Sequence, residues 1–136
     1  MGDEVVVILA ETIGLLPMLE GIYIADNQLT DVSLVPFIRN LRQCSQLCEL
    51  DLSRNKLDRN AAEVLREYLS SSSCFLTYLS LAKMSIDDYE ATRLMAAIAS
   101  RHTVRDLNLS ENLLGSHISL QKKETTAGNF VCLTKI

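Results

Sequence analysis

The apolar residues of this chain fall into four copies of one pattern. In each copy, apolar side chains occupy the first, fourth, sixth and eleventh positions of a phrase, and the phrases begin at Leu19, Leu47, Leu76 and Val104. The starting positions are 28, 29 and 28 residues apart, and all sixteen apolar positions hold Leu, Ile or Val. A fixed period of this length predicts a repeat architecture in which each copy is one structural unit.

Each phrase predicts a short strand followed by a turn. Its middle, Leu50-Asp51-Leu52 in the second copy, alternates apolar and polar residues as a half-buried strand does. Its end, Asn55-Lys56-Leu57, predicts a turn whose last residue returns to the core. The ninth position holds an asparagine in the first, second and fourth copies, at Asn27, Asn55 and Asn112, and Met84 in the third.

Between the phrases, apolar residues recur at helical spacing. Three trios align when counted back from the strand that follows each: Leu34, Phe37 and Leu41; Ala62, Leu65 and Leu69; Ala91, Leu94 and Ile98. Spacings of three and four residues place each trio on one face of a helix. The same register extended backwards reaches Val6, Leu9 and Ile13 and predicts a leading helix over residues 3–16, which Pro17 ends.

Polar residues predict where the helices begin. Ser33 stands where a helix cap is expected, and Pro36 then falls in the first turn, where its missing N–H costs nothing. The reciprocal spacing of a capping box occurs twice, in Asn60 with Glu63 and in Asp87 with Glu90.

The strand phrases and helical trios together resemble leucine-rich repeat proteins of the ribonuclease-inhibitor subclass, in which a repeat of about 28 residues forms a strand, a turn and a full helix. The resemblance implies an α/β fold, a right-handed solenoid that forms a curved horseshoe segment. Parallel strands are expected on the concave face and helices on the convex face. The repeats are expected to occupy residues 1–115. Residues 116–136 are expected to form a divergent tail or cap, because the register requires apolar residues where Ser119, Lys122 and Thr126 stand.

The resemblance also implies an asparagine ladder in which Asn27, Asn55 and Asn112 satisfy backbone groups of the turns. Met84 cannot hydrogen-bond in this way, so the ladder is expected to be interrupted and the turn of the third repeat to be looser than the others.

Residues between the strand leucines are expected to project from the concave face, where they are free to carry function. The candidate binding residues on this face are Glu20, Tyr23, Asp26, Glu49, Asp51, Arg54, Tyr78, Ser80, Lys83, Arg105, Asp106 and Asn108. Acids outnumber bases among them, and tyrosines are present. Because aromatic anchors supply contact area and charges steer association, the face predicts a protein partner with a basic patch.

Composition and charge restrict the function classes. The net charge of -4 and the mixed signs of the concave face argue against nucleic acid. No apolar run is long enough to span a bilayer. Four cysteines without a basic leader favour a reducing, cytoplasmic location. Their spacing matches no zinc site, and Cys44 is expected to be buried and Cys48 to face outward, so neither a metal nor a cofactor is expected.

The resemblance and the residues therefore favour a non-catalytic protein–protein interaction module, possessing no enzyme activity. Three alternatives stay open. The first is a GTPase-activating or other regulatory leucine-rich repeat protein, for which Arg54, Arg105 and Asn108 are the candidate donors to a bound GTPase. The second is a piece of a larger sensor of the NLR type. The third is a truncated gene product. A carboxylate pair such as Glu49 with Asp51 has no reason for a raised pKa on an open sheet face and does not predict catalysis.

Overall fold

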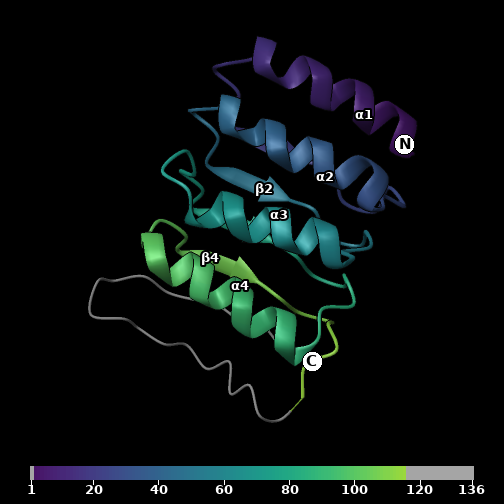
Figure 1. Ribbon diagram of the computed structural model, residues 1–136, viewed down its shortest axis with the longest axis vertical. Helices are drawn as coiled ribbons and strands as arrows, with labels where there is room; N and C mark the ends of the chain where they lie inside the picture. The colour runs from purple at the N-terminus through teal and green to yellow at the C-terminus, as the bar shows by residue number, and fades with distance from the viewer. Residues whose placement is uncertain (1, 116–136) are drawn as a thin grey trace.

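The computed structural model describes residues 2–115 and consists of alternating helices and strands stacked along one direction (Figure 1). In chain order the elements are α1 (Asp3–Thr12), β1 (Gly21–Tyr23), α2 (Asp31–Asn40), β2 (Glu49–Asp51), α3 (Arg59–Ser70), β3 (Tyr78–Ser80), α4 (Asp88–Arg101) and β4 (Asp106–Asn108). Short 3-10 segments, Ile13–Leu15 and Leu41–Gln43, follow α1 and α2. The expected residues of the tail or cap, 116–136, lie outside the described residues.

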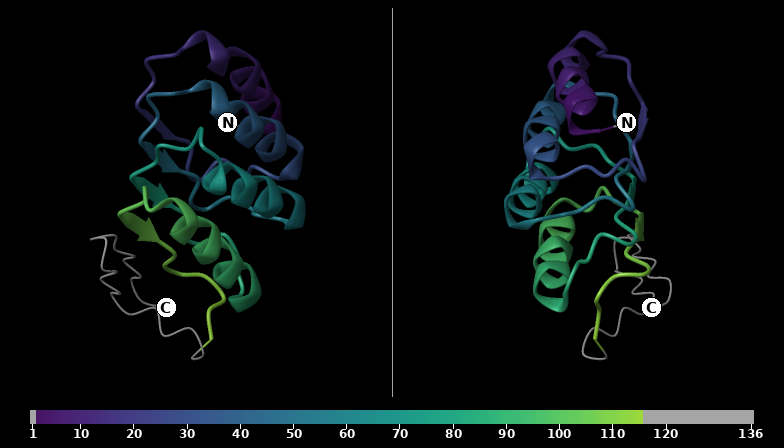
Figure 2. Two further views of the ribbon diagram at one scale, coloured as in Figure 1. Left: turned by 60° about the vertical axis from the view of Figure 1, so that its left-hand side comes forward. Right: turned by 90° about the vertical axis from the view of Figure 1, so that its right-hand side faces the viewer.

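The four strands form one parallel sheet in the order β1-β2-β3-β4. Residues at equivalent places in successive repeats are paired, as with Ile22, Leu50, Leu79 and Leu107. The helices form a second layer, and Figure 2 shows the two layers on opposite sides of the molecule. Because a helix is wider than a strand, the strand layer is the inner side of the stack. The predicted parallel α/β arrangement is confirmed.

The core lies between the two layers and is built from the predicted positions. All nine residues of the three helical trios are buried. Of the sixteen strand and turn positions, only Leu19, Leu57 and Leu114 are half-buried, and the others are buried. Burying each such side chain contributes roughly 1.5–3 kcal/mol, so stacking of neighbouring repeats is the main source of stability.

The helix starts differ in part from the sequence prediction. Asp87 caps α4 as expected, since its carboxylate accepts the N–H of Glu90 at 2.9 Å. The N-cap of α2 is Thr30 rather than Ser33. Ser33 lies inside the helix and donates its hydroxyl to Asp3, a residue of α1.

Two further predictions about the helices are corrected. Asn60 lies inside α3, which follows Asp58, so it does not cap the helix. Pro36 lies in the interior of α2 rather than in its first turn. The leading helix ends as an α-helix at Thr12 and continues for one turn as a 3-10 helix. Sequence patterns placed these elements correctly but missed boundaries that contacts between repeats decide.

Asn55 and Asn112 form the predicted ladder, and each acts on the turn of the preceding repeat. The Asn55 side-chain oxygen accepts the N–H groups of Asn27 and Leu29 at 3.1 and 3.0 Å. The Asn112 oxygen accepts those of Met84 and Ile86 at 2.8 and 3.0 Å. An asparagine therefore stabilises the turn one repeat earlier in the chain.

Because each asparagine stabilises the turn of the preceding repeat, the turn that lacks these bonds is not the one that contains Met84. The third turn receives both of its bonds from Asn112, so the expectation of a looser third turn has no support in these hydrogen bonds. The turn that Met84 would serve is the second. Within residues 2–115, the N–H groups of Asn55 and Leu57 have no hydrogen-bond acceptor. The gap in the ladder therefore lies at the second turn.

We predict that the amides of Asn55 and Leu57 exchange with solvent deuterium faster than those of Leu29 and Ile86. A backbone N–H that donates no hydrogen bond is not protected from hydrogen exchange, so it exchanges faster than one that does. Amide exchange followed by NMR measures the four rates in one sample. Met84→Asn supplies an oxygen at the right place and should slow exchange at Asn55 and Leu57 alone. Equal rates at all four amides in the unaltered protein would contradict the prediction.

Candidate functional site: the strand face

The strand face is the outer surface of the sheet, and its residues form rows because the strands are in register. One row consists of Gly21, Glu49, Tyr78 and Asp106. The next consists of Tyr23, Asp51, Ser80 and Asn108. Side chains alternate between the two sides of a strand, so these rows lie on the side away from the leucines. The structure thus brings together the candidate residues that the sequence pattern grouped.

Tyr23 has a fixed position on this face. Its ring is 61% exposed, and its hydroxyl donates to the carboxylate of Glu49 on the neighbouring strand. The ring folds back over Gly21, where an added Cβ would lie only 2.9 Å from Tyr23 Cε2. Glycine at position 21 therefore provides the space that lets the tyrosine reach Glu49. The sequence grouped these residues but gave no signal for this contact.

Ser80 does not belong to the exposed surface, and its prediction as a surface residue is wrong. Its side chain is 2% exposed and its Oγ lies 2.6 Å from the Oγ of Ser53, itself buried. Ser53 Oγ also accepts the N–H of Ala82 at 3.1 Å. Small hydroxyl side chains at these two places are held between the strands by their own hydrogen bonds. Strand alternation predicts the side of the sheet but not this burial.

Charged residues occur at both ends of the strands. Glu20, Cys48, Thr77 and Arg105 precede the four strands at equivalent positions, and Asp26, Arg54, Lys83 and Glu111 follow them. The second group shares a left-handed backbone, with φ of 58°, 60°, 52° and 56°. Such a conformation is uncommon outside glycine, and here it recurs in every repeat because the turn requires it. Arg54 follows its strand and Arg105 precedes its strand, so the two residues lie at opposite ends of the parallel strands.

The charges of the strand face are not neutralised by each other. Glu20, Asp26, Arg54, Lys83, Arg105, Asp106 and Glu111 are exposed, and Glu49 and Asp51 are half-buried. Within residues 2–115 the ion pairs are Lys56–Asp58 at 3.7 Å and Arg66–Glu90 at 2.5 Å, and neither includes a strand-face residue. Asn108 and Asp51 accept N–H groups of their own turns, from Ser110 and Ser53. Six acids face three bases, which leaves a surface with an acidic excess.

No group of three or more His, Cys, Asp or Glu residues in the described part of the chain is arranged to hold a metal ion. Cys44 and Cys74 are buried free thiols and Cys48 is half-buried, with its Sγ 3.4 Å from the Glu20 carbonyl oxygen. Cys132 lies outside the described residues. None of the helices within residues 2–115 combines the length and apolar character that crossing a lipid bilayer requires.

Three buried groups near the helix-to-strand corners are held in their neutral forms. Burial raises the pKa of the Cys44 thiol and of the Cys74 thiol above the usual value. Burial also raises the pKa of the Tyr68 phenol, with the neighbouring Cys74 adding to the effect. Thiols with raised pKa values are poor nucleophiles, so these groups contribute to packing rather than to chemistry.

We predict that the protein loses stability in alkaline solution. The unfolded chain releases its thiol protons above about pH 8.5, whereas the folded chain keeps them, so stability is complete below that pH and falls above it. The free energy of unfolding should therefore decrease as the pH rises from 8 to 10. Urea unfolding with a reductant present measures it. In Cys44→Ala the decrease should be smaller, because one buried thiol is removed, and an unchanged decrease would contradict the assignment.

The stacked strand–turn–helix units, one sheet and one helix layer, define this chain as a leucine-rich repeat protein. No family model matches the sequence. The chain is 32% identical over 97 residues to the ribonuclease inhibitor of Sus scrofa, covering 71% of this chain and 21% of that protein. It is 32% identical over 98 residues to the ribonuclease inhibitor of Mus musculus, covering 72% of this chain and 22% of that protein. The chain belongs to the ribonuclease-inhibitor-like leucine-rich repeat proteins, and it spans about a fifth of the length of these relatives.

Proposed function

We propose that this chain is a non-catalytic interaction module that binds a protein partner through the strand face. The observation that carries the proposal is the acidic excess of a face whose charges have no ion-pair partners within residues 2–115. The relatives support it, because a ribonuclease inhibitor is by name a protein that acts on another protein. The location we propose is the cytoplasm, as the free cysteines favour a reducing compartment.

The partner we propose carries a basic patch. Tyr23 and Tyr78 supply aromatic contact area within the rows, and Glu49, Asp51 and Asp106 lie around them. Aromatic residues near the centre of an interface commonly carry most of its binding energy, while surrounding charges set orientation and association rate. A basic ribonuclease has the required charge and is the first partner to test, because the relatives' name includes that enzyme.

We predict that Tyr78→Ala weakens binding to a basic partner by about 1–2 kcal/mol, roughly tenfold in Kd, without altering the fold. Tyr78 is half-buried in the row between Glu49 and Asp106, so its ring is available for contact and makes no essential core packing. Isothermal titration calorimetry with a basic ribonuclease measures the affinity, and circular dichroism monitors the fold.

Matched variants locate the binding face. Asp51→Lys should weaken binding, whereas Glu11→Lys on the exposed side of α1 makes the same change of charge away from the strand face and should have little effect. Ser80→Ala, at a buried position, should leave binding unchanged. If Asp51→Lys and Glu11→Lys weaken binding equally, attraction depends only on net charge and the strand face is not the binding site.

A further inference from the structure

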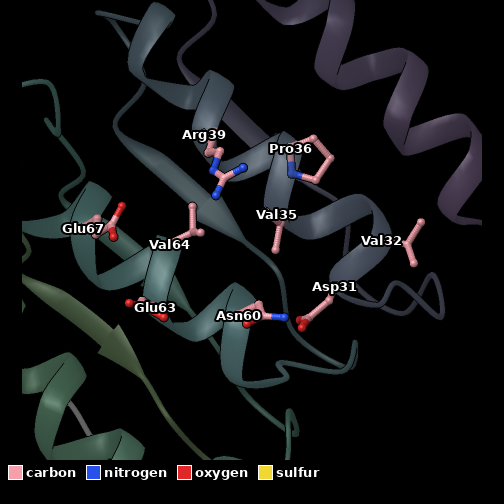
Figure 3. A pocket seen from close by; sticks show the side chains of 9 residues that line it. All are labelled: Asp31, Val32, Val35, Pro36, Arg39, Asn60, Glu63, Val64 and Glu67. Carbon is pink, nitrogen blue, oxygen red and sulfur yellow. The ribbon is translucent and has the colours of Figure 1, made fainter.

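The helix layer has a groove that plays no part in the function proposed for the strand face. It lies between α2 and α3, on the opposite side of the molecule from the sheet, and has a volume of about 580 Å³ (Figure 3). Residues of both helices line it. A smaller cavity of about 410 Å³ lies at the α3–α4 junction.

The floor of the groove is apolar. Val32, Val35 and Pro36 of α2 line it together with Val64 of α3. Val32 is 70% exposed, Val35 and Pro36 are half-buried, and Val64 is 7% exposed. Figure 3 shows Val35 and Val64 between the two helices. An apolar side chain from outside could therefore replace water on this floor.

Pro36 adds a polar feature to the same floor. Proline has no N–H, so the carbonyl of Val32, four residues earlier in α2, lacks its normal helical hydrogen bond. Residues four apart lie on one side of a helix, and both Val32 and Pro36 line the groove. The Val32 carbonyl oxygen therefore receives no hydrogen bond from residue 36, in a turn of α2 whose residues line the groove.

The rim of the groove is acidic. Glu63 and Glu67 of α3 are exposed, and within residues 2–115 neither has an ion-pair partner. Asp31 of α2 is half-buried and accepts the N–H of Ala61 at 3.2 Å. Arg39 is the one base among the lining residues. The lining therefore has two more negative than positive charges around an apolar centre.

Side chains bridge each helix junction, and fewer of them cross the α2–α3 junction than the α1–α2 junction. At the α1–α2 junction, Asp3 accepts hydrogen bonds from Thr30 and Ser33, and Asn40 donates to the Ala10 carbonyl at 2.8 Å. At the α3–α4 junction, Arg66 is paired with Glu90 at 2.5 Å. Between α2 and α3, the bond from Ala61 to Asp31 is the side-chain bridge that the described residues show.

We propose that this groove binds a short segment of a partner protein in which apolar residues are interspersed with lysine or arginine. The apolar side chains would cover the valines and Pro36, and the cationic groups would pair with Glu63 and Glu67. A donor on the segment would use the Val32 carbonyl. Charge complementarity decides the occupant. Beside an acidic or purely apolar segment, the carboxylates of Glu63 and Glu67 would have no cation to pair with. This site is separate from the strand face and would allow the chain to contact two partners at once.

The test uses a short synthetic peptide of lysine, leucine and serine, and a second peptide with glutamate at every lysine position. Each is titrated into the full ¹⁵N-labelled chain. The basic peptide should shift the amide signals of Val32, Val35, Glu63 and Val64, whether or not it also shifts those of the acidic strand face. The acidic peptide should shift none of them. Shifts confined to the strand face would overturn the proposal and would leave the proposed function of that face standing.

Paired charge reversals provide the matched control. Glu63→Lys/Glu67→Lys should raise the Kd for the basic peptide about tenfold, since both proposed ion pairs are lost. Glu4→Lys/Glu11→Lys makes the same change of net charge at exposed positions of α1 and should change the Kd by less than about threefold. Equal losses in the two variants would overturn the proposal, because binding would then depend only on overall charge.

Pro36→Ala tests the carbonyl. Alanine restores an N–H donor to the Val32 carbonyl, so the helix should become more stable and the peptide should bind about threefold more weakly. A higher melting temperature with weaker binding is the expected combination. Tighter binding in the more stable variant would overturn the role of the carbonyl.

Two other occupants have distinct results. A second copy of the chain would give a monomer–dimer equilibrium in sedimentation that Glu63→Lys/Glu67→Lys abolishes. The chain's own C-terminal segment contains Lys122 and Lys123, and if it filled the groove, Lys122→Glu/Lys123→Glu would shift the groove signals in the absence of peptide. Either result would overturn binding of a partner segment.

Discussion

Leu52→Asp is expected to unfold the repeat array. Leu52 is fully buried between the sheet and the helix layer, at the place where β2 ends. The substitution removes an apolar side chain and places a carboxylate where the surrounding core offers no cation. Together these effects should cost on the order of 5 kcal/mol, which is comparable to the total stability of many domains of this size. Loss of the helical circular dichroism signal at 25 °C is the measurement.

Two controls separate the causes of this loss. Leu52→Ala creates the cavity without the charge and should cost about 2–5 kcal/mol, leaving a folded but weakened protein. Arg54→Asp places the same new side chain two residues later, at an exposed position whose left-handed backbone aspartate tolerates. It should change stability by less than about 0.5 kcal/mol. If Arg54→Asp is as damaging as Leu52→Asp, the inward and outward assignments along this strand are wrong.

Asn55→Ala is expected to cost about 3–5 kcal/mol, although no apolar contact is lost. The Asn55 side chain accepts two N–H groups of the first turn and donates to the carbonyls of Ile24 and Leu52 at 3.0 and 2.9 Å. It is 7% exposed, so water cannot replace these bonds. Each buried group left without a partner costs roughly 1–3 kcal/mol. Urea unfolding of the variant measures the difference.

Asn27→Ala is the matched control, since Asn27 occupies the same position one repeat earlier. Its side chain is half-buried and makes one hydrogen bond, to the Ala25 carbonyl at 2.8 Å. The substitution should therefore cost about 1 kcal/mol or less. Similar losses for Asn27→Ala and Asn55→Ala would show that the bonds across repeats contribute little.

The sequence was sufficient for the periodic part of this structure. Apolar residues recur at a fixed interval because each repeat must bury the same face against its neighbours. Comparison of the four copies in the sequence shows this interval. The strand face followed from the same argument, since residues between the buried leucines have no other side to occupy. The rows that contain Glu49, Tyr78 and Asp106 were predicted for this reason.

What the sequence could not predict depends on contacts between repeats. Ser33 has the properties of a helix cap, but Asp3 from the preceding repeat binds its hydroxyl inside α2. Ser80 has the properties of a surface residue, but Ser53, which follows β2 in the preceding repeat, lies within hydrogen-bond distance. The groove between α2 and α3 is lined by residues of two helices, and no pattern within one helix predicts how the two are spaced.

The side-chain amides connect the repeats in two pairs. Asn55 connects the second repeat to the first, and Asn112 connects the fourth to the third. Met84 provides no such connection between the third repeat and the second, which are joined instead by strand pairing, by the Ser53–Ser80 hydrogen bond and by the Arg66–Glu90 ion pair. Opening of the second or the fourth repeat should therefore deprive the turn before it of its acceptors, so that the two repeats of each pair lose order together.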